Sequence, residues 1–324
     1  MENLLEVQNL SVTFRTFRGE VKAVRDVSFQ IQKGSVTAIV GESGCGKSVT
    51  SKAIMGLVKK PGFVEKESKI LFQGENIQQY TRKQWEEYRG AKCSICFQDA
   101  LTALNPTMTI GKQIMEKIRV HRNVSRKEAW EEAVEVLRKV GIPNPELRMK
   151  QYPHEFSGGM RQRVMIGIAV TLNPTLLIAD EPTTALDVTV QADILDMMKE
   201  IQKEHHMSII LITHDLGIVA NFATDIIVMY AGKIVERGSA YDIFYRPAHP
   251  YTEALLRAVP RLDMEGEELE TIEGAPPNMA NPPKGCPFAG RCKMRRDICE
   301  MAFPEETDLG EKHKVCCWLR KEEQ

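Results

Sequence analysis

The stretch Gly41-Glu42-Ser43-Gly44-Cys45-Gly46-Lys47-Ser48 matches the pattern G-x-x-x-x-G-K-[ST] at every fixed position. The nearly continuous apolar run at residues 35–40 before it is typical of a strand buried on both faces, and we expect a helix to begin near Lys47. Glycines in such a loop let backbone N–H groups converge on phosphate oxygens beside the positive end of the following helix. The sequence therefore predicts a phosphate-binding loop.

Two side chains of this loop have specific predicted roles. Lys47 would contact the β- and γ-phosphates, and the hydroxyl of Ser48 would ligate Mg²⁺. Cys45 is expected to be only a small loop residue. The predicted nucleotide contacts of the segment are Gly41, Ser43, Gly44, Cys45, Gly46, Lys47, Ser48 and Val49.

A second motif, Thr175-Leu176-Leu177-Ile178-Ala179-Asp180-Glu181, reads as a buried strand that ends in two acids. Ligands bind at the carboxyl ends of strands in open α/β sheets, so Asp180 would orient the Mg²⁺ shell. The carboxylate of Glu181 could polarise an attacking water. Alone, such a strand end is common; together with the phosphate loop it predicts an enzyme that hydrolyses nucleoside triphosphates.

Composition excludes several other classes of protein. The chain is 43% hydrophobic and 27% charged, which is ordinary for a globular protein. Lys and Arg number 43 against 44 Asp and Glu, so we expect no nucleic-acid partner. No stretch approaches the roughly 20 apolar residues that span a bilayer, and residues 1–6 do not begin a secretory signal. We expect a cytoplasmic chain unless another subunit holds it at a membrane.

Periodicity divides the chain into three parts. Residues 3–38 indicate β structure, and residues 100–172 are mostly helical, with a helix stopped by Gly141 and Pro143. Strand-like runs return at residues 176–179, 208–212 and 226–230, and the last begins a predicted hairpin. Pro276-Pro277 and Pro282-Pro283 predict an extended tail. A mostly parallel α/β core is thus interrupted by a helical insertion.

Four further segments resemble motifs of one family. Phe156-Ser157-Gly158-Gly159-Met160 is similar to the signature L-S-G-G-Q, from which Phe156 and Met160 depart. Gln98 after residues 93–97 resembles the Q-loop glutamine, Ala185-Leu186-Asp187 the D-loop, and His214 the switch histidine. Each segment alone has an ordinary structural interpretation. In this order, with the two motifs above, they resemble the ABC-type ATPases.

The resemblance implies the fold class: an α/β P-loop NTPase of the ABC cassette type, with a RecA-like core, an antiparallel β subdomain, a helical subdomain and a small cysteine-rich C-terminal extension. We expect the core with the β subdomain at residues 1–98 and 173–240. The helical signature subdomain is expected at residues 99–172, and the extension at residues 241–324.

The resemblance also implies a mechanism in which two cassettes pair head to tail and enclose ATP. The chain's own ATP would be served by the loop at 41–48 and by Gln98, Asp180, Glu181 and His214, with Lys47, Gln98, Glu181 and His214 as catalytic residues. Ser48, Gln98 and Asp180 would surround Mg²⁺. Ser157, Gly158, Gly159 and Asp187 would act across the dimer. Phe14 is our choice for stacking on adenine, with Phe17 as the alternative.

Five of the eight cysteines lie in the last forty residues, where Cys286, Cys292 and Cys299 are followed by Cys316-Cys317. Together with residues 247–252, 272–277 and 281–288, this tail is similar to the extension of peptide- and nickel-importer ATPases. That branch implies a [4Fe–4S] cluster on Cys286, Cys292, Cys299 and Cys317, with Cys316 as the spare. A zinc site is the alternative, although zinc usually binds tighter C-x₂₋₄-C pairs.

The implied function is to energise di- or oligopeptide import from the cytoplasmic face of the membrane, as a peripheral ATPase. Its implied partners are a second homologous ATPase, two integral-membrane permease subunits and an extracytoplasmic solute-binding protein. Nickel import is the close alternative. A soluble ABC ATPase of translation or DNA repair is the distant one, disfavoured by a single cassette, a C-terminal cysteine cluster and the lack of excess positive charge.

Overall fold

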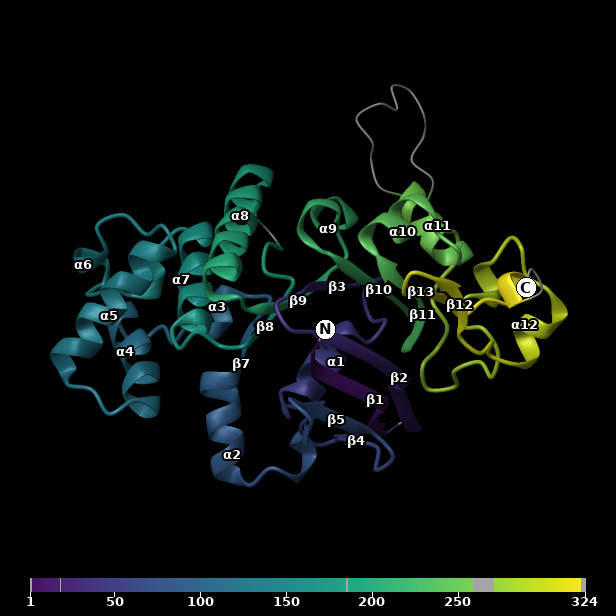
Figure 1. Cartoon of the computed structure of the whole chain (residues 1–324), viewed down its shortest axis with the longest axis horizontal. Helices are drawn as coiled ribbons and strands as arrows, with labels where there is room; N and C mark the ends of the chain where they lie inside the picture. The colour runs from purple at the N-terminus through teal and green to yellow at the C-terminus, as the bar shows by residue number, and fades with distance from the viewer. Residues whose placement is uncertain (1, 18, 185, 259–270, 322–324) are drawn as a thin grey trace. The chain divides into compact units, whose positions relative to one another are not determined.

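The computed structural model describes residues 2–17, 19–184, 186–258 and 271–321. The chain divides into two compact units (Figure 1). The first unit holds Lys33–Ser35 and Gln79–Leu211, and the second unit holds Glu2–Gln32, Val36–Gln78 and the chain from Ile212 onward.

The first unit is largely helical. Its elements are α2 (Arg82–Glu87), the π-helical turn η2 (Tyr88–Lys92), β7 (Cys93–Cys96), α3 (Ala100–Ala103), α4 (Ile110–His121), α5 (Arg126–Lys139), α6 (Pro145–Arg148), η3 (Pro153–Glu155), α7 (Gly158–Val170), β8 (Leu176–Asp180), α8 (Val188–His205) and β9 (Ser208–Thr213), which ends in the second unit. Helices α4, α5 and α7 pack against one another (Figure 1). Helix α5 begins at a capping box of Ser125 and Glu128 and ends before Gly141, whose φ is +73°.

Strands β7 and β8 of the first unit are parallel and pair Cys93 with Leu176 through Cys96 with Ala179. Every residue of β8 is buried, as the sequence pattern predicts for a strand covered on both faces. Strand β9 is also fully buried and lies next to β8. The acids Asp180 and Glu181 therefore leave the sheet at its carboxyl edge.

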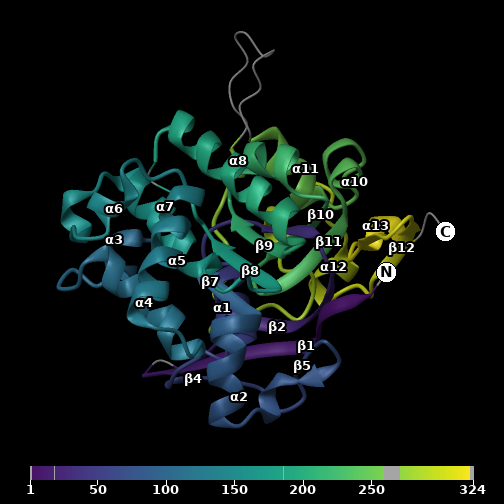
Figure 2. The same cartoon turned by 60° about the vertical axis from the view of Figure 1, so that its left-hand side comes forward.

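The second unit contains an antiparallel sheet with the order β2-β1-β5-β6, and β4 also pairs with β1. Its strands are β1 (Asn3–Thr16), β2 (Gly19–Gln32), β4 (Gly62–Val64), β5 (Lys69–Phe72) and β6 (Glu75–Asn76), followed by the turn η1 (Ile77–Gln79). Strand β2 buries Val27, Phe29 and Ile31 and exposes Ser28 and Gln30, the alternation of a half-buried strand. Helix α1 (Lys47–Ile54) contacts β1 and β2 (Figure 2).

The second unit also contains the strand order β12-β13-β11-β10-β3, in which β3 and β10 are parallel and the other pairs are antiparallel. The strands are β3 (Val36–Val40), β10 (Asp225–Tyr230), β11 (Lys233–Ser239), β12 (Thr307–Gly310) and β13 (His313–Val315). Ala231 and Gly232, both at positive φ, join β10 and β11, as expected for a tight hairpin. Helix α9 (Leu216–Phe222) packs on β3, and α10 (Ala240–Tyr245) packs on β10 and β11.

The C-terminal part of the second unit is attached to β11 through Glu236, which is fully buried. Its carboxylate accepts hydrogen bonds from the backbone N–H groups of Ala248 and His249 at 2.7 and 2.9 Å, and lies 2.8 Å from Nε2 of His313. The remaining elements are α11 (Pro250–Arg257), η4 (Ala289–Arg291), α12 (Asp297–Met301) and α13 (Trp318–Lys321). Glu236 thus fixes the start of α11 and the strand β13 against the same sheet.

The element types predicted from periodicity are confirmed for the β structure at 3–38, the helices at 100–172 and the later strands. Over the described ranges, no helix has both the length and the apolar character needed to cross a membrane.

Candidate nucleotide and cysteine sites

The loop at residues 41–48 joins β3 to α1 and has glycine at three positions with a positive φ. Gly41, Gly44 and Gly46 have φ values of +148°, +78° and +107°. A Cβ atom at Gly41 would lie 2.1 Å from the carbonyl oxygen of Met229 on β10, and one at Gly46 would lie 2.6 Å from that of Ala23. The loop backbone is therefore pressed against neighbouring strands of its own unit.

Lys47 lies inside this loop and is only 4% exposed. Its Nζ donates hydrogen bonds to the carbonyl oxygens of Gly41 and Glu42 at 2.6 and 3.0 Å, and lies 3.8 Å from Sγ of Cys45. Burial raises the pKa of the Cys45 thiol, and the nearby Lys47 ammonium opposes that rise only in part. Cys45 therefore stays a neutral packing residue, as predicted.

The other predicted contacts of the loop differ in exposure. Ser43 and Gly44 are exposed on the loop, and Ser48 and Val49 are half-buried.

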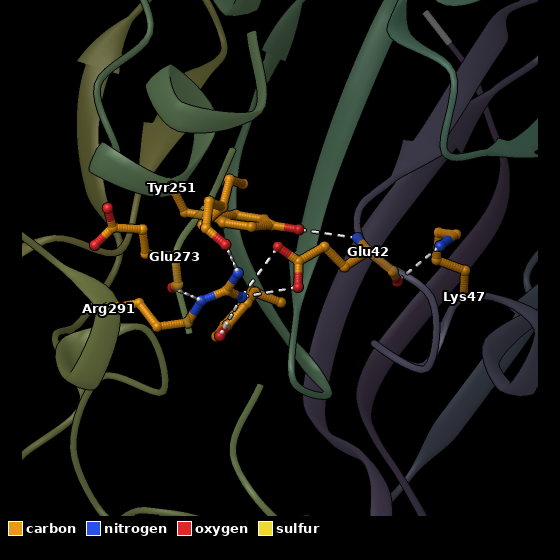
Figure 3. Close-up of polar contacts among 7 residues, drawn as sticks. Glu42, Lys47, Tyr251, Glu273 and Arg291 are labelled. Carbon is orange, nitrogen blue, oxygen red and sulfur yellow. Dashed lines mark hydrogen bonds and ion pairs between the residues drawn. The ribbon is translucent and has the colours of Figure 1, made fainter. Parts of the chain in front are cut away.

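Glu42 is held from two sides (Figure 3). Its backbone N–H donates a hydrogen bond of 2.9 Å to the hydroxyl of Tyr251 on α11. Its carboxylate accepts from Nη1 of Arg291 at 3.0 and 2.8 Å. Both contacts join the phosphate-binding loop to segments far along the chain.

In the first unit, Gln98 and Glu181 meet although 83 residues separate them: Nε2 of Gln98 donates a hydrogen bond of 2.8 Å to Oε2 of Glu181. The same oxygen accepts from the hydroxyl of Thr184 at 3.0 Å. Glu181 has φ +49°, a left-handed conformation that costs about 1–2 kcal/mol in a residue other than glycine. Asp180 is 5% exposed, and its charge adds to the burial that raises the pKa of Cys96 to about 12.

The segment Ser157-Gly158-Gly159 begins helix α7, and Oγ of Ser157 accepts a hydrogen bond from the N–H of Met160 at 3.3 Å. A Cβ atom at Gly159 would lie 2.7 Å from Cγ1 of Val190. Asp187 caps α8, and its Oδ1 accepts from the N–H of Val190 at 3.0 Å. The predicted signature segment and the predicted D-loop residue therefore lie against each other. Ala185 of the D-loop lies outside the described residues.

The other two predicted contacts belong to the second unit. His214 follows β9 and is exposed, and Asp215 after it caps α9. Phe14 is half-buried on β1, where it pairs with Gly62; a Cβ atom there would lie 2.5 Å from Cε1 of Phe14. The alternative, Phe17, is fully exposed. The assignment of Phe14 to adenine stays a prediction.

Four of the five C-terminal cysteines line one cavity of about 20 Å³, together with His249 and Trp318. These four are Cys286, Cys292, Cys299 and Cys317. The backbone N–H of Cys286 donates to the carbonyl of Cys299 at 2.7 Å, and this approach leaves no room for a side chain at Gly285, whose Cβ would lie 2.1 Å from the same oxygen. Cys316 does not line the cavity.

Burial dominates the electrostatics of this cavity. It raises the pKa of Cys286 to about 12 and also raises the pKa values of Cys292 and Cys317, and the neighbouring thiols add to each rise. Burial lowers the pKa of His249 to about 4, so this imidazole is neutral. Nδ1 of His249 accepts from the N–H of Tyr251 at 3.0 Å, which places the ring proton on Nε2, 4.0 Å from Sγ of Cys286.

The described residues contain no group of three or more His, Cys, Asp or Glu side chains already arranged to hold a metal ion. The four thiols that line the cavity are nevertheless close enough together to share its lining with His249.

Comparison with known proteins identifies the family of the chain. The family model "ABC transporter" matches residues 24–184, and the model "Oligopeptide/dipeptide transporter, C-terminal region" matches residues 235–299. The dipeptide transport ATP-binding protein DppD of Bacillus subtilis is 53% identical over 320 residues, which are 99% of this chain and 96% of that protein. The chain belongs to the ATP-binding proteins of the oligopeptide/dipeptide ABC transporters.

Other members of this family and fold show the same likeness. The oligopeptide transport ATP-binding protein OppD of B. subtilis is 52% identical over 98% of this chain and 88% of that protein. Among solved structures, the dimeric ATP-binding cassette MJ0796 bound to ADP and Pi covers 73% of this chain and 98% of its own at a TM-score of 0.66 and 24% identity. CbiO1 of Clostridium perfringens covers 76% of this chain and 92% of its own at a TM-score of 0.65 and 28% identity. The fold is that of an ABC ATPase cassette.

The sequence motifs did not indicate Arg291 and Tyr251 as neighbours of the phosphate loop. Both lie in segments that resemble the peptide-importer branch, so that resemblance was the available signal, but no local pattern relates either residue to Glu42.

We predict that Gly41→Ala lowers the free energy of unfolding by about 3 kcal/mol, because a Cβ atom collides with the Met229 carbonyl and the backbone is strained. Gly44→Ala is the matched control, because it has open space around it and only the left-handed strain, about 1 kcal/mol. Urea unfolding followed by circular dichroism measures both. Equal losses in the two variants would contradict the packing argument.

Proposed function

We propose that this chain binds and hydrolyses ATP to energise the import of di- or oligopeptides across the cytoplasmic membrane. Two observations support it. The relatives that match almost the whole chain are named dipeptide and oligopeptide transport ATP-binding proteins. The Gln98–Glu181 hydrogen bond, which holds a carboxylate at the end of a buried strand, is the single structural observation that carries the catalytic part.

In the proposed binding step, the loop at 41–48 surrounds the phosphates. The N-terminus of α1 is capped by Gly46, whose lack of a side chain leaves the first turn open to an anion. Lys47 already lies within the loop and exchanges its bonds to the Gly41 and Glu42 carbonyls for phosphate oxygens. Phe14 stacks on the base.

In the proposed hydrolysis step, Glu181 is the general base for the attacking water, and Gln98 orients its carboxylate. His214 contacts the γ-phosphate. Ser48, Gln98 and Asp180 would supply the oxygen ligands that Mg²⁺ prefers, with Asp180 buried at the end of β8. The ion, when bound, neutralises charge on the phosphates.

A head-to-tail pair completes each site. The exposed Ser157 and Gly158 at the start of α7 present hydroxyl and backbone N–H donors to the γ-phosphate bound by the other cassette. Gly159 and Asp187 lie beside them and act across the same dimer. ATP therefore joins the two cassettes, and hydrolysis releases them, which drives the membrane subunits.

The proposed assembly contains a second homologous ATPase, two integral-membrane permease subunits and an extracytoplasmic solute-binding protein, with this chain on the cytoplasmic face of the membrane. The names of the relatives support a transporter, and the CbiO1 structure is described as part of the ABC transporter complex CbiONQ. We also retain the division into a core at 1–98 and 173–240, a helical subdomain at 99–172 and an extension at 241–324.

For the extension, we propose a [4Fe–4S] cluster on Cys286, Cys292, Cys299 and Cys317. Their shared cavity and the position of Cys316 outside it support this ligand set over the other choices of four. The raised pKa values mean that the thiols need a bound cation to become thiolates. Zinc on the same residues is the alternative.

We predict that Glu181→Gln retains ATP binding and lowers hydrolysis at least about 100-fold, because the amide keeps the shape but cannot accept a proton. A phosphate-release assay and an ATP titration measure the two effects. Glu204→Gln, at an exposed residue paired with Lys139, is the control and should hydrolyse ATP normally. Near-normal ATP hydrolysis by the Glu181→Gln variant would show that Glu181 is not the general base.

The chain purified without oxygen should contain about four iron and four sulfide per molecule and absorb broadly in the visible blue. Cys292→Ser should lose both the colour and the iron, and Cys316→Ser should retain them, because Cys292 lines the cavity and Cys316 does not. Elemental analysis of iron, sulfide and zinc distinguishes the two kinds of site. Stoichiometric zinc without sulfide would favour the zinc alternative.

We predict that the working pair is a heterodimer, which makes the two sites unequal. In the complex with the partner ATPase, Lys47→Ala should abolish binding at the site built on this chain's own loop. Ser157→Arg should damage the other site, because it places bulk and charge against the γ-phosphate. Photolabelling with an ATP analogue identifies the labelled subunit. A stable homodimer that reaches the full rate and assembles in two copies with the membrane subunits would refute the heterodimer.

A further inference from the structure

Arg291 directly precedes the cavity cysteine Cys292, and its guanidinium contacts Glu42 of the phosphate-binding loop (Figure 3). Its side chain is only 7% exposed, and Glu42, its ion-pair partner, is 23% exposed. Nη1 of Arg291 donates to Oε1 and Oε2 of Glu42 at 3.0 and 2.8 Å. Such a sheltered pair is screened by solvent far less than a surface ion pair.

The guanidinium of Arg291 also donates hydrogen bonds to other parts of the second unit. Nε donates to the carbonyl of Glu273 at 2.9 Å, and Nη2 donates to the carbonyl of Ile272 at 2.8 Å. Nη1 also donates to the hydroxyl of Tyr230 on β10 at 3.0 Å. A planar guanidinium can reach acceptors in several directions at once, whereas an ammonium group on a flexible stem cannot hold this geometry.

Glu42 is an acidic residue inside a loop that is built to bind an anion. Without its partner, its carboxylate would repel a triphosphate in the same loop and weaken the attraction of Lys47 and the α1 N-terminus. The Arg291 guanidinium removes this repulsion, and the Tyr251 hydroxyl fixes the Glu42 backbone at the same time. Both partners come from the C-terminal part of the chain.

We propose that Arg291 is a positioning residue for the phosphate loop: it neutralises and orients Glu42, so that the C-terminal extension sets the affinity for ATP. The proposal rests on the ATP-binding function proposed above. Arg291 ends η4 and directly precedes Cys292, one of the cavity cysteines, so two adjacent residues contact the phosphate loop and line the cavity.

The test is the dissociation constant of the full chain for a non-hydrolysable ATP analogue. Arg291→Gln should weaken binding about tenfold, equivalent to about 1.4 kcal/mol. Glu42→Gln should bind within about threefold of the unchanged chain, since it removes the charge that needs neutralising. The double variant Glu42→Gln/Arg291→Gln should regain most of the lost affinity, which a merely structural role of Arg291 would not produce.

Arg295→Gln is the matched control and should bind ATP normally, because Arg295 lies four residues further along the chain but is 57% exposed and pairs with Glu300 at the surface. Arg291→Lys is used if Arg291→Gln does not fold. Lysine keeps the positive charge but loses the several N–H donors of the guanidinium, so this variant should bind the ATP analogue about threefold more weakly. Thermal melting establishes that each variant is folded.

Three results would overturn the proposal: unchanged affinity in a folded Arg291→Gln variant, a double variant as weak as Arg291→Gln, or normal affinity in Arg291→Lys when Arg291→Gln is unfolded. Failure of the unchanged chain to bind the analogue would instead count against the proposed function.

Discussion

The turn after β3 is the constraint on which the nucleotide loop depends. The carbonyl oxygen of Met229 on β10 lies 2.1 Å from where the Cβ atom of a side chain at position 41 would be. The first residue after β3 must therefore be glycine. The next turns are again left-handed glycines, and they aim the loop at the N-terminus of α1. A parallel pair of buried strands and a helix thus fix the loop by packing, before any ligand is present. The loop backbone needs little reorganisation to bind an anion, and Lys47 exchanges its two carbonyl partners for phosphate oxygens.

Local patterns predicted the elements that carry the chemistry because each depends on nearby residues. The fully buried β3 and β8 and the end of α5 at Gly141 are all visible within a few positions of the chain. The same holds for the signature segment, where Ser157 caps α7. Phe156, which departs from the common signature, is 3% exposed and packs in the core, so this departure leaves the donors of the segment in place.

Contacts between distant segments could not be derived in the same way. The motifs placed Gln98 and Glu181 in one site, but their hydrogen bond and the left-handed φ of Glu181 depend on how β7 and β8 pair. The link from Arg291 to Glu42 spans 249 residues, and a lone arginine before a cysteine has no local signature. Spacing alone also left open which cysteines converge, since Cys316 and Cys317 are adjacent but only Cys317 lines the cavity.

The C-terminal tail pairs with the same sheet that precedes the phosphate loop, because β13 lies next to β11 and β3 belongs to that sheet. The contacts of the tail with the loop therefore depend on this one sheet. Glu236 is fully buried on β11 and would be costly to leave unpaired, by about 3–5 kcal/mol for a buried charge. It therefore holds the start of α11, and α11 supplies the Tyr251 hydroxyl that binds the backbone of Glu42. The hairpin partner β10 supplies both the carbonyl that excludes a side chain at Gly41 and the Tyr230 hydroxyl that binds Arg291. Because one sheet of the second unit positions all of these groups, a change in the tail can reach the phosphate loop through directly contacting neighbours.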